Sequence, residues 1–439
     1  MPAAHDVRIT DFDHDGRGVA RIDGKTVFVA GALPGEQVRL AIRRRHRHFD
    51  EAQLLEVLEP AASRVTPRCP HAGVCGGCSL QHMDAAAQIV AKQRMLADAL
   101  SRIGKVTPAA WLPPLTDTVW GYRRRGRLSV RRVAKKGRVL VGFREQEQPR
   151  FVADVERCEV VHPALGAHIG ELAVLIGSLE AADAIAQIEF AAGDEVLALV
   201  FRHLRPLGEA DRAALIAFAR ARGLAVYLQP GGIDSVHPLW PQAPELSYRL
   251  PTGVEGESVT LAFEPLDFIQ VNGALNRKMV AQALALLDPR PHERVLDLFC
   301  GLGNFTLPLA RRVAAVAGVE GEHGLVERAM RNATRNGIEH ARFHVANLFE
   351  DQRHAAWARE PWDAILLDPP RAGAEQLLAY LPGRQTRRVV YVSCHPASLA
   401  RDAGLLVHRH GFTLSRAGVM DMFPHTAHVE AIALFERAA

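Results

Sequence analysis

The stretch Val295–Phe305, VLDLFCGLGNF, decides the fold of this chain. Its first residues form a short apolar run that predicts a buried strand, and Gly301 and Gly303 let the backbone turn tightly and approach a ligand. A helix is expected to open at residues 304–306, with Pro308 near its first turn, where proline is tolerated. Strand, glycine turn and helix in this order are typical of a nucleotide-type pocket.

The apolar run that follows indicates which cofactor this pocket takes. Val313–Val319 ends in Glu320, and an acid at the tip of a second strand can accept both hydroxyls of a ribose. The chain contains no GxxxxGK[ST] loop that would hold phosphates. The pattern therefore favours S-adenosylmethionine, which has a ribose and no phosphate, over NAD or ATP.

Strand and helix patterns alternate regularly from the pocket to the C-terminus, which predicts an α/β unit with an open parallel sheet. Three motifs in it carry candidate chemistry: LLDPPR with Asp368, VSCHP with Cys394 and HVEAIALFE with Glu430. A lone cysteine beside a pocket is more often an inert buried thiol. Next to an acid at a strand tip, however, Cys394 is better interpreted as a nucleophile.

The composition indicates a globular protein of two to four domains, with 439 residues, 48% hydrophobic and 23% charged. No apolar run approaches the length of a membrane span, and the N-terminus lacks the pattern of a signal peptide. We therefore expect a cytoplasmic location and no membrane partner. Six cysteines in a chain of this length are ligands, nucleophiles or buried thiols rather than a disulfide scaffold.

Positive charge is concentrated in two places. Eleven Lys/Arg and two Glu lie between residues 119 and 150, a local charge of +9 against a net +4 for the whole chain. Such a cluster is usually only a solvated face, but a second basic run after the N-terminal strands favours a polyanionic partner. We therefore expect RNA phosphates to be contacted by Arg123–Arg138 and by Arg39, Arg43, Arg44, Arg45 and Arg47.

Three close cysteines predict a metal site in the loop CPHAGVCGGCSLQH. Cys69, Cys75 and Cys78 have C-x5-C-x2-C spacing on glycine-rich backbone, which packs too poorly to require three thiols for other reasons. Cys158 is the best candidate for the fourth ligand. Four thiolates suit zinc or an iron–sulfur cluster, and spacing alone leaves both open.

Three domains follow from these patterns. Residues 1–62 have short strands separated by DHDG, DG and PGE turns, which predict an OB-like β-barrel. Residues 63–262 form a central α/β domain with the cysteine loop, the basic segment and a helix at 84–104 that is a candidate to pack on the catalytic domain. Residues 165–260 carry no assignable motif. Residues 263–439 form the Rossmann-like catalytic domain.

The motifs together resemble a known family. DHDGRGVARIDGKTVFVAGALPGEQV is similar to the TRAM domain, an RNA-binding barrel, and VLDLFCGLGNF, LLDPPR, VSCHP and HVEAIALFE resemble the RNA 5-methyluridine methyltransferases. With the barrel and the cysteine loop added, the chain resembles the bacterial enzymes that methylate C5 of one uridine in 23S ribosomal RNA. The tRNA-modifying members of the family typically lack both the barrel and the cysteine loop.

This resemblance implies roles for individual residues. It makes Cys394 the nucleophile that adds to C6 of the uracil and Glu430 the base that removes the C5 proton. It implies 23S ribosomal RNA as the substrate, and a [4Fe–4S] cluster on Cys69, Cys75, Cys78 and Cys158. Separately from the resemblance, we expect a monomer. The cofactor positions that it implies are Gln270, Phe299, Asn304, Glu320, Asn347 and Asp368, although Asp is more common than Asn at position 347.

Other functions remain as alternatives. The same chemistry could act on another 23S rRNA uridine or on tRNA, and a relict fold of this kind could serve as a non-catalytic ribosome assembly factor. Intact Cys394 and Glu430 argue against the assembly factor. Cytosine-C5 enzymes would place a Pro-Cys pair where this chain has Ser393-Cys394, and amino-group methyltransferases would have an aromatic residue in place of Arg371.

Overall fold

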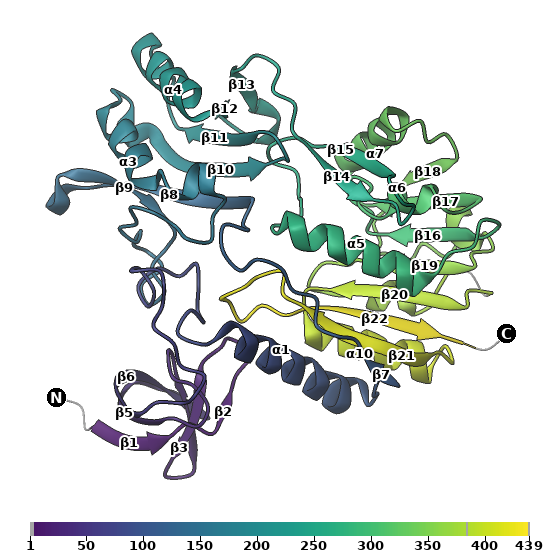
Figure 1. The fold of residues 1–439 in the computed structure, drawn as a ribbon, viewed down its shortest axis with the longest axis horizontal. Helices are drawn as coiled ribbons and strands as arrows, with labels where there is room; N and C mark the ends of the chain where they lie inside the picture. The colour runs from purple at the N-terminus through teal and green to yellow at the C-terminus, as the bar shows by residue number, and fades with distance from the viewer. Residues whose placement is uncertain (1–3, 383–384, 438–439) are drawn as a thin grey trace.

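Three large β-sheets and one two-stranded sheet organise the described chain (Figure 1). The computed structural model describes residues 4–382 and 385–437. An N-terminal barrel, a central sheet and a large C-terminal sheet form three units, and the long helix α1 (Ala85–Ala99) runs between the barrel and the C-terminal sheet.

One segment closes the N-terminal sheet into a barrel. The strand order is β1 (Ala4–Arg8), β5 (Gln37–Arg45), β6 (Phe49–Glu59), β4 (Lys25–Val29), β3 (Gly18–Ile22) and β2 (Asp11–Phe12). Only two residues separate β1 from β2, yet β1 pairs with β5 at one edge and β2 with β3 at the other. The continuous segment from β1 to β2 therefore joins the two edges of the sheet, and the barrel predicted from the turn signals is present.

The central sheet is covered on both faces. Its strand order is β13 (His237–Trp240), β12 (Leu224–Gln229), β11 (Leu197–His203), β10 (Ile185–Ala192), β8 (Arg125–Val133) and β9 (Arg138–Gly142). Helices α3 (Ile169–Ser178) and α4 (Glu209–Arg222) share a core with one face. The other face contributes Ala191, Val200 and Tyr227 to the core of the C-terminal unit. The two units are therefore packed through continuous apolar contact.

The C-terminal sheet has eight strands, five of them parallel. The order is β18 (Ala341–Val345), β17 (Ala315–Glu320), β16 (Arg294–Leu298), β19 (Ala364–Leu367), β20 (Arg388–Ser393), β22 (Glu430–Glu436), β21 (Thr413–Met420) and β7 (Ala110–Trp111). The first five are parallel, and β22 is antiparallel to both neighbours. The chain order reverses at β16, and in such sheets ligands bind beyond the carboxyl ends of the strands at this point.

Helices cover both faces of this sheet. Side chains along each strand alternate between two cores, as a period of two requires. One face carries α5 (Gly273–Leu287), α6 (Thr306–Ala310) and α7 (His323–Arg335), and the other carries α1, α8 (Ala356–Arg359), α9 (Glu375–Leu378) and α10 (Pro396–His408). The remaining elements are α2 (Pro163–Gly166), the π turn η1 (Leu100–Gly104), the hairpin β14 (Ser247–Pro251) with β15 (Ser258–Ala262), and the 3-10 turns Ala134–Lys136, Ala182–Ala184 and Ile233–Ser235.

The segment around α1 packs on the C-terminal unit, although in sequence it lies within 63–262. Leu96, Leu100 and Val106 belong to the core of the C-terminal sheet, and β7 pairs with the edge strand β21. The Lys92 ammonium, 1% exposed, donates to Asp421 Oδ1 at 2.7 Å and to the Phe423 carbonyl oxygen at 3.0 Å. A buried charge pair therefore fastens α1 to the loop before β22.

Among the described residues, no helix is long and apolar enough to cross a membrane.

Removing one partner of the Lys92–Asp421 pair should lower the free energy of unfolding more than removing both partners. Lys92→Ala leaves the Asp421 carboxylate buried without its partner and should lower the free energy of unfolding by about 3–5 kcal/mol. Lys92→Met with Asp421→Leu removes both charges and should recover most of that loss. Urea unfolding followed by circular dichroism measures both variants. If the double variant is as unstable as Lys92→Ala, the lost bond to Phe423, rather than an unpaired charge, accounts for the effect.

Candidate active site

A cavity of about 530 Å³ lies beyond the carboxyl ends of the parallel strands. The eight residues that the sequence predicts for catalysis and cofactor binding all line it: Gln270, Phe299, Asn304, Glu320, Asn347, Asp368, Cys394 and Glu430. They are contributed by segments up to 160 positions apart, and the sheet brings them to one edge because parallel strands end on the same side.

The glycine turn after β16 is fixed from both sides. Within the turn, Thr306 Oγ1 donates to the buried Asp297 carboxylate at 2.5 Å, which joins the strand to α6. From the neighbouring strand, Glu320 Oε2 accepts from the backbone N–H of Gly301 at 3.0 Å. Gly303 has φ +98°, a backbone conformation that favours glycine. Glu320 Oε1 accepts from Gly321 N–H at 2.6 Å and from Glu322 N–H at 3.2 Å, whereas Oε2, with one backbone donor, keeps acceptor capacity for a ribose hydroxyl.

Asn347 and two phenylalanines form the wall beyond Glu320. Asn347 Oδ1 accepts from Phe349 N–H at 3.1 Å, and its Nδ2 donates to Glu350 Oε1 at 2.8 Å. The Phe299 and Phe349 rings are tilted against each other with centroids 5.8 Å apart. Apolar faces beside hydrogen-bonding groups suit a planar heteroaromatic ring such as adenine.

Asn304 is held by two residues to which the sequence analysis gave no role. Its Oδ1 accepts from Asn276 Nδ2 at 2.9 Å and from the buried Tyr248 hydroxyl at 3.1 Å. Its Nδ2 donates back to Asn276 Oδ1 at 3.1 Å. Asn276 is a polar residue on an otherwise apolar face of helix α5. That break in the apolar pattern is the feature of the sequence that could have identified it.

The reactive end of the cavity gathers acidic groups around a thiol. Burial raises the pKa of Asp368 to about 7, helped by the charges of Asp297 and Glu320. Burial, together with the charge of Asp368, raises the pKa of Glu430 to about 8. A carboxyl group with a pKa in this range is matched to proton transfer near neutral pH.

Cys394 directly follows β20. The same surroundings disfavour the thiolate form of its side chain. Burial raises its pKa to about 12, and the charges of Glu430 and Asp368 act in the same direction. The positive charge of Arg371, which lines the same cavity, opposes them. Cys394 is therefore protonated at rest and needs a nearby cation or base to become nucleophilic.

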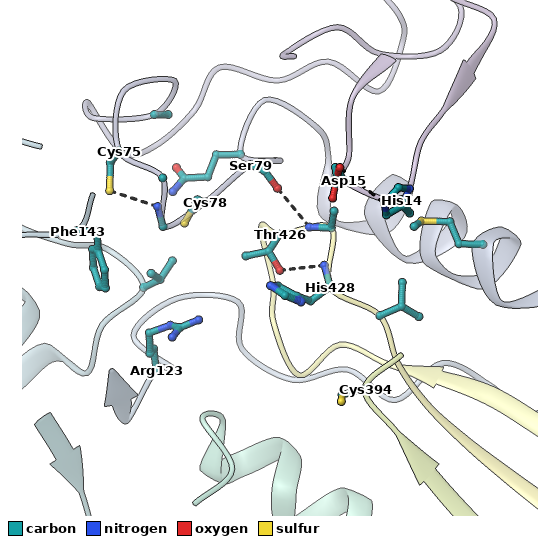
Figure 2. Close-up of a pocket in the computed structure, with 18 of the residues that line it drawn as sticks. His14, Asp15, Cys75, Cys78, Ser79, Arg123, Phe143, Cys394, Thr426 and His428 are labelled. Atoms are coloured by element: carbon teal, nitrogen blue, oxygen red, sulfur yellow. Dashed lines mark hydrogen bonds and ion pairs between the residues drawn. The ribbon is translucent and has the colours of Figure 1, made fainter. Parts of the chain in front are cut away.

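A second cavity of about 910 Å³ meets the first at Cys394 (Figure 2). Of the residues that the structure describes, Arg371, Cys394 and His428 line both. The walls of the larger cavity come from the barrel turn with His14 and Asp15, the cysteine loop, α1 and the catalytic sheet. The thiol therefore faces a cofactor-sized space on one side and a wider space between the three units on the other.

The four cysteines of the predicted metal site all line the larger cavity: Cys69, Cys75, Cys78 and Cys158. Burial raises the pKa of Cys75 to about 11 and of Cys78 to about 12, and the other thiols add to both shifts. These thiols are therefore near enough to repel one another as thiolates. Within the described parts of the chain, the one set of three or more potential ligand atoms lying within 4.8 Å of one another is Asp13, His14 and Asp15, all in one turn.

The basic segment does not form one RNA-facing surface, and the prediction for two of its arginines is wrong. Arg124 is 5% exposed, and its Nε donates to the Gln270 carbonyl oxygen at 3.0 Å. Arg125 donates to the carbonyl oxygens of Pro265 and Leu266 at 2.9 and 2.7 Å. Arg123, by contrast, lines the larger cavity. A run of like charge does not reveal which of its members another unit will cover.

Comparison with known proteins agrees with this geometry. Residues 251–438 match the family model described as tRNA (Uracil-5-)-methyltransferase, and residues 5–55 match the TRAM domain. The chain is 61% identical over 432 residues to the 23S rRNA (uracil(1939)-C(5))-methyltransferase RlmD of Xanthomonas euvesicatoria, covering 98% of this chain and 96% of that protein. It is 59% identical over 433 residues to the protein of the same name from Stenotrophomonas maltophilia, with the same coverage.

A solved structure shares the fold. The tRNA (uracil-54, C5)-methyltransferase of Pyrococcus abyssi, solved with S-adenosyl-L-homocysteine, has a TM-score of 0.72 at 22% identity and covers 98% of this chain and 100% of its own. The predicted barrel and methyltransferase fold are thereby confirmed, and so is the predicted family. With near-complete coverage at about 60% identity, the chain belongs to the RlmD family of 23S rRNA uracil-C5 methyltransferases.

Proposed function

We propose that this enzyme transfers a methyl group from S-adenosylmethionine to C5 of a uridine in 23S ribosomal RNA, the position numbered 1939 in the names of its relatives. The observation that carries the proposal is the position of Cys394 on the wall between two cavities, with Glu430 in the smaller one. A methyl donor and a base flipped out of RNA can then reach the same thiol from different sides.

The proposed reaction uses Cys394 first. Uracil C5 becomes nucleophilic only after a group adds to C6, and a thiolate can both add and leave again. The Cys394 thiol passes its proton to the neighbouring Asp368 carboxylate, Arg371 favours the resulting thiolate, and the Sγ–C6 bond forms with an enolate at C4–C5. When bound, S-adenosylmethionine would supply an electrophilic methyl group to C5, and its S–CH3 bond would break to leave neutral S-adenosylhomocysteine.

Glu430 then completes the reaction. Its carboxylate removes the proton from C5, the C5–C6 double bond re-forms, and the Cys394 thiolate leaves C6. Because burial and Asp368 raise the pKa of Glu430 to about 8, its carboxylate has a high proton affinity for an acidic residue. Asp368 lines the same cavity and is the second candidate for this base.

Cofactor binding is proposed for six residues of the smaller cavity. Glu320 would accept hydrogen bonds from the ribose hydroxyls. Asn347 and Phe299 would contact the adenine. The cavity as a whole is rich in carboxylates, which favours a cationic ligand such as a sulfonium. The full proposed set is Gln270, Phe299, Asn304, Glu320, Asn347 and Asp368.

We also propose that a [4Fe–4S] cluster is held by Cys69, Cys75, Cys78 and Cys158. Four thiols line one cavity, and burial together with the charges of neighbouring thiols raises the pKa of Cys75, Cys78 and Cys158, so that ionising the set requires compensating positive charge. A single zinc ion with Zn–S of about 2.3 Å would bring thiolates to about 3.8 Å from one another. The thiols are not gathered that tightly here, which favours a larger group. The expected monomeric state and cytoplasmic location stay predictions.

Nucleoside analysis tests the function directly. In a strain lacking this protein, mass spectrometry should show that one 5-methyluridine is lost from 23S rRNA and none from tRNA. Re-expression of the wild type should restore it and Cys394→Ala should not. Loss from tRNA would assign the enzyme to the other substrate class, and restoration by Cys394→Ala would support the assembly-factor alternative.

The two catalytic roles have different signatures. Cys394→Ala should abolish turnover and give no covalent enzyme–RNA species, because no adduct can start. Glu430→Gln should accumulate a methylated adduct that survives denaturation, and RNA with 5-fluorouridine should trap the wild type at the same stage. Denaturing gels with labelled RNA measure both effects.

Cys300 provides a matched control, because it is a buried cysteine in the same cavity. Cys300→Ala should still form the adduct with 5-fluorouridine RNA. Methylation by folded Cys394→Ala at near the wild-type rate would refute the nucleophile. If Glu430→Gln releases product normally, Glu430 is not the base, and Asp368 becomes the candidate for that role.

Iron and sulfide analysis tests the cluster. Protein purified without oxygen should be brown, contain about four iron and four sulfide per chain as a [4Fe–4S] cluster requires, and lose its visible absorbance in Cys75→Ser. Cys300→Ser, outside the proposed set, should keep it. Stoichiometric zinc without iron would overturn the cluster while leaving the four ligands.

A further inference from the structure

Two arginines of the central unit reach into the catalytic unit next to the cofactor cavity. Arg124 and Arg125, at the start of β8, contact the irregular segment 264–272 that leads into α5. This segment includes Gln270, which lines the cavity. Four of its backbone carbonyls accept hydrogen bonds from these two residues: Pro265, Leu266, Gln270 and Val271.

Arg124 also contacts a second wall of the same cavity. Its guanidinium lies over the Tyr248 ring, 4.5 Å from the centroid, and the Tyr248 hydroxyl donates to Asn304. The nearest carboxylate is Asp194, at 3.9 Å. One buried side chain therefore touches both the backbone of Gln270 and the ring that orients Asn304.

The surroundings of Arg124 are shaped to admit it. A Cβ added to Gly273, the first residue of α5, would lie 2.8 Å from Arg124 Nη1, so any larger residue would displace the guanidinium. Arg124 is almost completely buried, although an arginine that only joined two surfaces could remain at their edge. An irregular loop whose carbonyls lack regular partners needs such donors to keep one conformation.

We infer that Arg124 and Arg125 are positioning residues for the methyl donor: they hold segment 264–272 and Tyr248 in the conformation that binds the cofactor. Neither residue lines the cavity, so they act through Gln270 and Asn304. This inference rests on the proposed function, because it takes the cavity to be the cofactor site. It also assigns to cofactor binding two charges that the sequence pattern attributed to RNA.

Cofactor affinity measured without RNA tests the inference. Arg124→Lys keeps the charge but loses the planar fork, and Arg125→Lys does the same, so each should weaken binding of S-adenosylhomocysteine about tenfold by calorimetry. Gly273→Ala displaces Arg124 without changing it and should act in the same direction. In steady-state assays the KM for S-adenosylmethionine should rise while kcat changes little.

Two control variants separate positioning from other roles. Arg277→Gln removes a neighbouring contact between the same units, the 2.6 Å ion pair with Asp194, and should leave cofactor affinity unchanged. Arg131→Gln, at an exposed position of β8, should also leave it unchanged. Arg124→Gln should leave the slope of log RNA affinity against log salt unchanged, whereas loss of a phosphate contact would reduce it by about one.

The outcomes are distinct. Wild-type cofactor affinity in Arg124→Lys, Arg125→Lys and Gly273→Ala overturns the positioning role and leaves the proposed function intact. Equal weakening in Arg277→Gln also overturns it, because the effect would then come from general contact between the units. If the wild type itself binds no S-adenosylhomocysteine, the proposed function and this inference fail together.

Discussion

The hydrogen bond from Thr306 to the buried Asp297 carboxylate ties strand β16 to helix α6 across the glycine turn, and the rest of the site depends on it. The turn places Phe299 and Gly301 against Glu320, and Glu320 in turn caps the turn through the Gly301 N–H. Burial raises the pKa of Asp297 to about 7. The carboxyl group is thus retained in the core at an electrostatic cost, which the bond to Thr306 partly offsets.

Electrostatic repulsion continues from Asp297 to the other acidic groups at this edge of the sheet. Asp297 and Glu320 raise the pKa of Asp368, and Asp368 raises the pKa of Glu430 and of the Cys394 thiol. A cationic ligand in the cavity would relieve this repulsion, and a sulfonium is such a cation. The repulsion among these acidic groups would therefore strengthen binding of a cationic cofactor. After methyl transfer the sulfonium becomes a neutral thioether, so this contribution would be lost and release of the product would be favoured.

The sequence places the residues proposed for catalysis at one cavity because each sits in a short motif at a strand end. Parallel strands bring Asp368 and Cys394 to one edge whatever the rest of the chain does. The residues behind them were not predictable. Arg124 looks in sequence like any other member of a basic run, and only the packing of the central sheet on the C-terminal unit buries it.

Helix α1 shows the same limit. Ile103, an apolar residue near the end of the helix predicted at 84–104, is 51% exposed. The buried stripe instead runs through Gln88, Lys92 and Leu96, at four-residue spacing. Lys92 is tolerated inside because the loop before β22 offers it the Asp421 carboxylate and the Phe423 carbonyl oxygen. Gln88 is tolerated because its Oε1 accepts from the His425 N–H of the same loop, more than 300 residues away in the chain, while its Nε2 donates to the nearby Met83 carbonyl oxygen. No local pattern contains that information.

The shared wall at Cys394 has a further consequence for the order of events. Among the described residues, Arg371, Cys394 and His428 alone line both cavities, so the space proposed for the donor would overlap the space proposed for the nucleic acid at the proposed point of reaction and nowhere else. Arrival of one reactant need not block the other, and the spent donor can depart while the RNA stays in place. Such a layout suits a large, slowly exchanging substrate served by a small molecule that must be renewed at each cycle.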